Sequence, residues 1–170
     1  MSKSKKVALA GILIAVGVIF SAFYIPIGVA KVFPIQHFIN VLAGVILGPV
    51  YAVSMAFVTS LIRLMTGTGS LLAFPGSMCG ALLSGLLFQY SKRVIMAFLG
   101  EVIGTGIIGA LVAYPVATLL MSKTVAFYGF IIPFGISTSV GAGISLLLII
   151  SLKRMGILSR FLSEGDYNEL

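Results

Sequence analysis

The chain has 170 residues, of which 59% are hydrophobic and only 9% are charged, and its mean hydropathy is +1.20. Water-soluble domains carry about 25% charged residues, so the composition excludes a soluble enzyme, a secreted disulfide scaffold and a nucleic-acid-binding module. In a chain that must face lipid, the net charge of +7 first indicates orientation, because Lys and Arg favour the cytoplasmic side of a membrane.

The sequence predicts an all-α integral membrane protein with six transmembrane helices. A hydrocarbon core about 30 Å thick requires about 20 residues per helix, so six helices and their turns fit the length of this chain. The whole chain, residues 1–170, is predicted to be one membrane domain with a solvated cytoplasmic tail at 153–170. The predicted spans, in chain order, are residues 7–25, 36–48, 50–65, 74–90, 94–120 and 125–152.

Proline and glycine set several of these boundaries. Pro26 lacks an N–H donor and favours an exit from the first helix. That helix is interpreted as uncleaved, because the only Ala-x-Ala, residues 8–10, precedes its apolar centre. Gly48-Pro49 divides a long apolar stretch into two short helices. Pro75 suits the first turn of the fourth span.

The distribution of basic residues predicts that both termini are cytoplasmic. Six spans place most Lys and Arg residues inside, as the positive-inside rule requires. The residues assigned to the cytoplasmic side are Lys3, Lys5, Lys6, Lys92, Arg93, Lys153, Arg154 and Arg160. Those assigned to the outer side are Lys31, Arg63 and Lys123.

Small residues spaced four apart mark faces where helices approach closely in lipid. The first span carries Gly11 with Ala15 and Gly17 with Ser21. In the fourth and fifth spans, where we expect internal packing, the small residues are Gly76, Gly80, Ser84, Gly100 and Gly104. The small face of the first span either packs internally or docks another membrane subunit.

Polar side chains in the second span form the first candidate binding cluster. Gln36, His37 and Asn40 lie three and four residues apart, so they share one face of a helix. Polar groups in hydrocarbon must find partners or line a cavity. The cluster therefore either contacts a ligand or anchors and caps the helix start. A zinc site is not expected, because His37 and Cys79 are too few ligands.

Arg63 and Glu101 are the ionisable candidates. Arg63 either stabilises the outer end of its helix and reaches the interface, or lies beside an outer cavity with the loop at residues 66–70. Glu101, within the fifth span, is either structural or coupled to ligand. Counting along the helices places Glu101 about 10 Å deep from the inner side and Arg63 about 20 Å deep, so no direct pair is expected.

Aromatic and hydroxyl side chains complete the candidate site. Phe74, Tyr114, Phe127 and Tyr128 can stack on a flat heterocycle, or they form an interfacial aromatic belt. Hydroxyl groups at residues 137–139 of the sixth span serve the site or join helices.

Three stretches resemble the ThiW family. They are KVFPIQHFINVLAGVILGP at residues 31–49, TGSLLAFPGSM at 68–78 and GEVIGTGIIGA at 100–110. The likeness extends over about residues 5–155, and such polar motifs are far more specific than a hydropathy profile. Members of this family are substrate-binding S components of energy-coupling factor (ECF) vitamin transporters.

The resemblance implies an S-component bundle in a prokaryotic cell membrane. Its expected ligand is a thiazole precursor of thiamine, hydroxyethylthiazole. Import would need a coupling membrane subunit and two ATPase subunits that use ATP, and the chain itself would hold no cofactor or metal. The family docks its coupling subunit through Ala-x-x-x-Ala on the first span, here Gly11-x-x-x-Ala15. The expected substrate-binding residues are Gln36, His37, Asn40, Arg63, Ser70, Phe74, Ser77, Glu101, Tyr114 and Tyr128.

No catalytic constellation or nucleotide motif is visible in the sequence, so we expect binding without an enzymatic step. Residues 66–70 lack the Lys-Ser or Lys-Thr ending of a P-loop. An S component for another vitamin or thiamine precursor and a secondary transporter that uses Glu101 as its proton site remain alternatives. A membrane enzyme would need Glu101 and His37 as an acid-base pair, and these two are predicted at opposite depths.

Overall fold

The computed structural model describes residues 1–27 and 30–162, and this part of the chain is mainly helical. Its α-helices are α1 (Lys3–Ile19), α2 (Pro34–Ile46), α3 (Pro49–Met65), α4 (Ala73–Ser91), α5 (Val94–Ile103), α6 (Ala110–Pro115) and α7 (Ile131–Arg154). Two π-helical segments, Gly104–Gly109 and Val116–Leu120, extend α5 and α6 into one helical rod. Short 3-10 helices occupy Phe20–Ala22 and Leu158–Arg160. A helix therefore overlaps each of the six predicted ranges.

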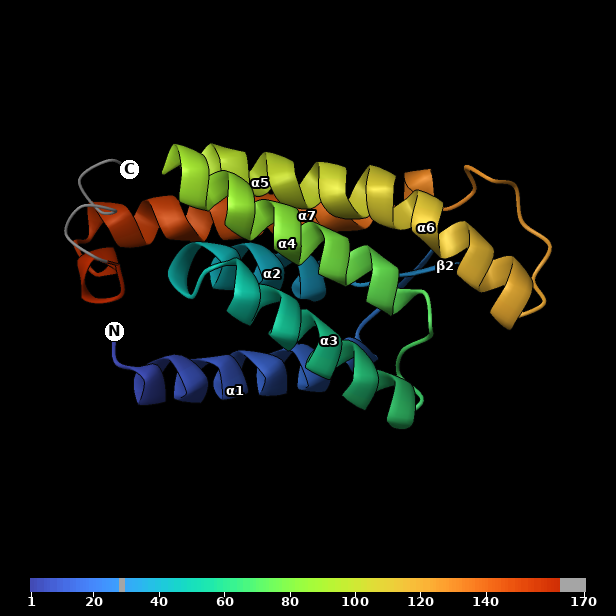
Figure 1. Cartoon of the computed structure of the whole chain (residues 1–170), viewed down its shortest axis with the longest axis horizontal. Helices are drawn as coiled ribbons and strands as arrows, with labels where there is room; N and C mark the ends of the chain where they lie inside the picture. Colours follow the sequence, from blue (N-terminus) through green and yellow to red (C-terminus); the bar gives the residue numbers. More distant parts are fainter. Residues whose placement is uncertain (28–29, 163–170) are drawn as a thin grey trace.

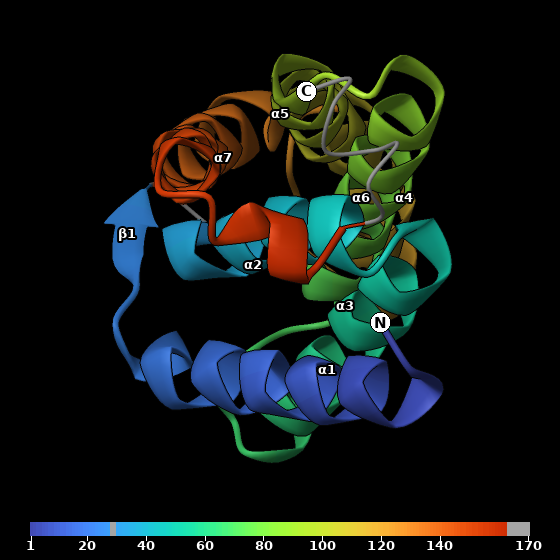
Figure 2. The same ribbon diagram turned by 90° about the vertical axis from the view of Figure 1, so that its left-hand side faces the viewer.

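α5 and α7 run close to the long axis of the molecule, whereas α1 and α2 cross it obliquely, and α2 lies at the centre of the bundle (Figures 1 and 2). Seen from the end, α1 and α3 lie on one side of α2, and α5 and α7 lie on the other (Figure 2). α2 packs against α7, α4 and α3. Its side chains are buried from Ile39 to Ile46, so α2 is the core helix of the fold.

Helix lengths divide the bundle into long and short elements. Among the described residues, three helical segments are long and apolar enough to cross a membrane: Lys3–Ala22, Val94–Leu120 and Ile131–Arg154. α2 has 13 residues and is therefore only about 20 Å long, which is less than the roughly 30 Å of a hydrocarbon core. Because α2 is shorter than the long helices around it, space remains between those helices at the end of α2.

Two predicted helix ends are wrong. The first helix ends at Ala22 instead of residue 25, because Ile25–Ile27 (β1) pairs antiparallel with Ala30–Val32 (β2) in a two-stranded hairpin. Branched side chains such as Ile25 and Val32 favour strands. The sixth helix begins at Ile131 instead of residue 125, and most of residues 122–130 form coil and turns. The predicted tail carries its carboxylates at Glu164, Asp166 and Glu169, which lie outside the described residues.

The predicted break at Gly48-Pro49 is confirmed. Gly48 has a φ of +91°, a conformation that suits glycine, and Pro49 begins α3. The turn between α2 and α3 therefore depends on both residues.

Glycines bring α4 into close contact with the rod that begins at α5. A Cβ on Gly104 would lie 2.6 Å from the Cys79 carbonyl oxygen, and one on Gly100 would lie 2.6 Å from the Leu83 carbonyl oxygen. The predicted packing role of these small residues is thus confirmed. In α1, Gly17 packs on Thr59, whereas nothing lies within 4 Å of a Cβ on Gly11.

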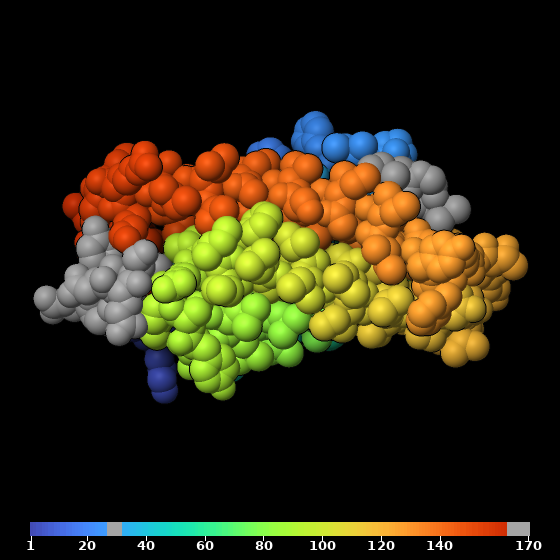
Figure 3. All heavy atoms as spheres, turned by 90° about the horizontal axis from the view of Figure 1, so that it is seen from above, coloured from blue at the N-terminus to red at the C-terminus, as the bar shows by residue number. Residues whose placement is uncertain are grey.

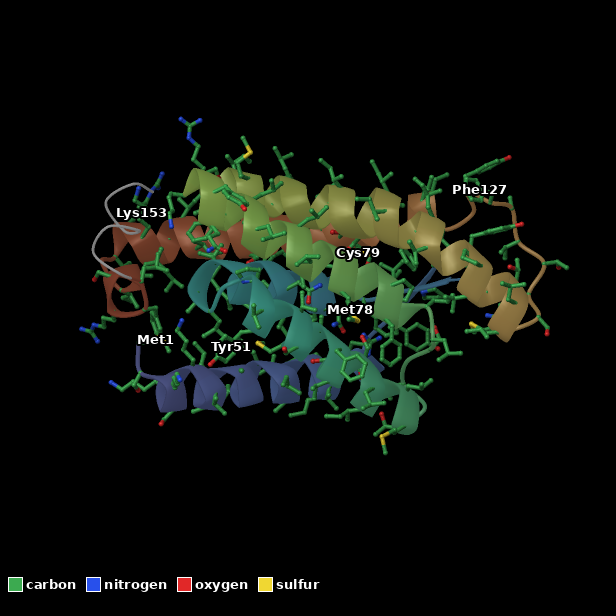
Figure 4. All side chains as sticks on the ribbon, in the orientation of Figure 1. Met1, Tyr51, Met78, Cys79, Phe127 and Lys153 are labelled. Atoms are coloured by element: carbon green, nitrogen blue, oxygen red, sulfur yellow. The ribbon has the colours of Figure 1, made fainter. Side chains whose placement is uncertain are left out.

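The two ends of the bundle differ in what they carry. Met1 and Lys153 lie at one end, and Phe127 lies at the other, in the loop that follows the long rod (Figure 4). The start of α1 and the end of α7 therefore share one end, as the predicted topology requires.

One face of the bundle is formed by α7 and the α5 rod, packed side by side (Figure 3). Their exposed side chains are largely aliphatic, which suits contact with lipid. Exposed residues of these elements include Ile103, Ile107, Ile108, Val112, Ile132, Ile136, Val140, Ile144 and Leu147.

Candidate functional site

A cavity of about 150 Å³ lies where the first turn of α2 meets the last turn of α3. The loop between α3 and α4, the first turns of α4, the rod and α7 complete its wall. The lining residues are Phe33, Gln36, His37, Arg63, Gly69, Ser70, Leu72, Ala73, Gly76, Ser77, Thr105, Lys123, Phe134 and Ser137. Segments from most of the chain therefore converge on one small volume.

Half of the predicted binding residues line this cavity. They are Gln36, His37, Arg63, Ser70 and Ser77. Asn40 and Glu101 do not line it but lie buried, at 2% and 0% exposure. Any effect of Asn40 on a ligand would therefore pass through its neighbours.

The three predicted aromatic binding residues lie elsewhere. Phe74 packs on Phe57 with 5.6 Å between ring centroids, and Tyr114 packs on Phe127 with 5.2 Å. Tyr128 is 69% exposed. None of the three lines the cavity, which sequence spacing alone does not reveal.

Glu101 is the centre of a buried hydrogen-bond network. Its Oε1 atom lies 2.8 Å from His37 Nδ1 and accepts hydrogen bonds from Asn40 Nδ2 at 3.0 Å and Thr105 Oγ1 at 3.0 Å. Asn40 also donates to the Ser77 carbonyl oxygen. An ionised carboxylate only accepts, so with Glu101 ionised His37 donates through Nδ1. The network ties α2, α4 and the α5 rod together beneath the cavity.

The predicted separation of His37 and Glu101 in depth is wrong. The prediction placed the start of the second span at the outer surface. In the structure the hairpin of β1 and β2 precedes α2, and the short α2 brings His37 to the level of Glu101, within hydrogen-bond distance. Among the described residues the ion pair of Glu101 is with His37, not with Arg63.

Arg63 does not reach the interface, contrary to one of its two predicted interpretations. It is only 1% exposed, and its Nη1 atom donates to Gln36 Oε1. Its Cζ atom lies 3.9 Å from the centroid of the Phe33 ring, a cation-π contact. Its Nε and Nη2 atoms are buried and have no acceptor among the described residues. The loop folds back on this helix end, and Gly69 lies directly on the Arg63 backbone.

Several lining residues were not predicted as binding residues. They include the aromatic walls Phe33 and Phe134 and the hydroxyl group of Thr105. Ser137, one of the hydroxyl residues at 137–139 that were expected either to serve the site or to join helices, also lines the cavity. Ser137 accepts a hydrogen bond from the Phe33 backbone N–H at 3.0 Å and so joins α7 to the start of α2. Phe33 lies in the motif at residues 31–49, directly before Pro34, so the sequence could have indicated it as a candidate lining residue. Nothing in the local sequence distinguishes Phe134 from other apolar residues.

Comparison with known proteins identifies one family. The family model described as "Thiamine-precursor transporter protein (ThiW)" matches residues 7–155. No curated protein and no solved structure matches the chain.

Proposed function

Because the chain belongs to the ThiW family of thiamine-precursor transporters, we propose that it is the S component of an ECF importer. In this proposal it captures the thiazole precursor of thiamine, with hydroxyethylthiazole as the first ligand to test. It resides in a prokaryotic cell membrane with both termini in the cytoplasm. The observation that carries the proposal is the size and lining of the cavity.

The volume of the cavity favours a ligand with one ring. Pockets for drug-sized molecules measure about 300–1,000 Å³, whereas an apolar cavity of about 150 Å³ takes up a single benzene molecule. The cavity here is also about 150 Å³. A thiazole with a short side arm matches this size.

The lining combines apolar walls with a few polar groups. Phe33, Leu72 and Phe134 offer flat or aliphatic surface to a heterocycle. Ser70 and Ser77 bring hydroxyl groups to the cavity wall, and the Ser77 hydroxyl is placed by a hydrogen bond to the Ala73 carbonyl oxygen at 2.7 Å. Specific pockets use this pattern of apolar walls and few polar groups.

The energy for import would come from partner proteins. The proposed partners are a coupling membrane subunit and two ATPase subunits that hydrolyse ATP. Gly11 and Ala15 support a docking role, because both are exposed on α1 and no atom lies within 4 Å of a Cβ on Gly11. A smooth exposed face of this kind permits close approach of another helix.

The experiment for this proposal measures both ligand and partners. The chain is purified from native membranes under mild conditions, and its bound small molecules and co-purifying proteins are identified by mass spectrometry. Hydroxyethylthiazole binding to the isolated chain is then measured by calorimetry. Binding together with co-purified ATPases supports the proposal, and a chain that binds no thiazole contradicts it.

Substitution of Gly11 and Ala15 by leucine should prevent association with the coupling subunit. Leucine side chains would hold an approaching helix away, while the inner face of α1, which includes Leu13 and Gly17, stays unchanged. We expect loss of partner co-purification and of uptake, with unchanged ligand binding by the isolated chain. The control is Gly143→Leu, since a Cβ at this α7 position also meets nothing within 4 Å. Loss of ligand binding in the α1 variant would show that this face packs internally.

A secondary transporter that uses protons is the alternative with a specific observation in its favour. The His37–Glu101 pair lies next to the cavity, and Glu101 Oε2 is buried without a described partner. Intramembrane carboxylates often serve proton coupling. Vesicles that contain only this chain distinguish the two functions, because thiazole uptake driven by a proton gradient alone would favour the secondary transporter.

A further inference from the structure

Arg63 is held in place on two sides within the cavity wall. Gln36 Oε1 accepts a hydrogen bond from its Nη1 atom, and the Phe33 ring covers one face of the guanidinium at 3.9 Å. The side chain is 1% exposed and lines the cavity. These contacts fix the plane of the guanidinium.

The remaining edge of this guanidinium is a two-pronged donor without an acceptor. Nε and Nη2 are both buried and unpartnered among residues 1–27 and 30–162. These two nitrogens lie on the same edge of the planar group, so their N–H bonds point in parallel. Such an edge matches the two oxygens of a carboxylate or the oxygens of a phosphate.

A purely structural role would leave these donors unpaired. Buried polar groups in proteins are nearly always hydrogen-bonded, and an exception calls for an explanation. In the described part of the chain the only carboxylate is Glu101, and its Oε1 atom is bonded to His37, Asn40 and Thr105. The charge of Arg63 therefore has no counter-ion in the described protein.

The charges that surround the cavity also favour a negatively charged group inside it. Its lining includes two cationic residues, Arg63 and Lys123, and no Asp or Glu. The first turns of α2 and α4 also lie in its wall, and helix N-termini favour negative charge. A neutral ligand would leave this positive potential unbalanced.

We infer that the ligand carries an oxyanion group, a carboxylate or a phosphate, which accepts two hydrogen bonds from Nε and Nη2 of Arg63. This inference rests on the proposed function and narrows its substrate from a neutral thiazole alcohol to an acidic single-ring derivative. The ring occupies the apolar part of the cavity, and Lys123, which is exposed and contributes to the lining, attracts the anion.

The test compares three probes on the purified full-length chain by calorimetry. The probes are 5-(2-hydroxyethyl)-4-methylthiazole, its phosphate ester and (4-methylthiazol-5-yl)acetate. We expect at least one of the two anions to bind about tenfold or more tightly than the alcohol, since charge-assisted hydrogen bonds are the stronger ones. The preferred anion then shows whether the group is a phosphate or a carboxylate, and either result supports the inference.

Substitutions distinguish the contribution of the paired Nε and Nη2 donors of Arg63 from the contribution of its positive charge. Arg63→Lys keeps the charge but removes the parallel donors, so it should weaken binding of the preferred anion by about tenfold, a larger factor than its effect on binding of the alcohol. Lys123→Gln, at an exposed position, should weaken anion binding by about two- to fivefold, with the effect fading at high salt. Arg93→Lys is the matched control, because Arg93 is exposed and does not line the cavity.

Two outcomes would overturn the inference in distinguishable ways. If the alcohol binds as tightly as both anions and Arg63→Lys affects all three probes equally, the inference fails and the proposed function stands. If the folded chain binds none of the probes, the proposed function fails, and this inference fails with it. Alcohol binding and a monodisperse elution profile confirm that each variant is folded.

Discussion

Replacement of Glu101 by alanine should lower the stability of the bundle more than any other substitution of a buried polar residue described above. The change leaves His37, Asn40 and Thr105 without the oxygen that they share. Each buried donor left without an acceptor costs about 1–3 kcal/mol, and here three donors lose the same oxygen. The measurement is the unfolding free energy in detergent micelles, by titration with a denaturing detergent, together with the yield of monodisperse protein.

Glu101→Gln is the matched variant for this prediction. Glutamine has nearly the same shape and keeps one carbonyl oxygen for the donors of Asn40 and Thr105, so its cost should be about 1–3 kcal/mol. Equal stability of the wild-type and Glu101→Ala proteins would show that the network contributes nothing to the fold.

Gly141→Ala should both destabilise the protein and reduce ligand binding. A Cβ on Gly141 would overlap the Pro34 carbonyl oxygen and would lie 3.0 Å from His37 Cβ. The nearest atom belongs to the backbone, so α7 and the first turn of α2 must move apart. Overpacking of this kind typically costs about 1–3 kcal/mol, and here it also displaces Phe33, Gln36 and His37 in the cavity wall.

Gly143→Ala provides a control two residues away in the same helix. Nothing lies within 4 Å of a Cβ at this position, and alanine favours helix over glycine by up to about 1 kcal/mol. We expect unchanged ligand affinity and equal or greater thermal stability in detergent. If Gly141→Ala and Gly143→Ala behave alike in both measurements, the close contact between α7 and α2 does not control the cavity.

The candidate binding cluster of α2 shows how much of a site local sequence patterns can predict. Gln36, His37 and Asn40 were predicted to share a helix face, and the structure places all three in α2 with buried side chains. Their partners lie far along the chain, since His37 and Glu101 are separated by 64 residues. Helical spacing fixes which side chains are neighbours on one helix, but the axial offset between helices decides which of them meet across the bundle.

The aromatic residues also show that local sequence patterns do not reveal which side chains line the cavity. Residues such as Tyr128 and Tyr114 carry the chemistry that a heterocycle needs, yet they lie outside the cavity, whereas Phe33 and Phe134 line it. Residue type is a property of the sequence. The direction of each side chain depends on where its helix begins. Residues 122–130 form coil and turns, so α7 begins only at Ile131.

The amino-acid sequence by itself determined the apolar helical character of the chain, the break at Gly48-Pro49 and the glycine faces of α4 and α5, because these follow from composition and local spacing. Only the tertiary structure decided that Arg63 is enclosed beside Gln36 and Phe33, and that Glu101 binds His37. Those contacts depend on the short α2 being set between longer helices. The length and offset of packed helices arise from the whole bundle, so no single segment encodes them.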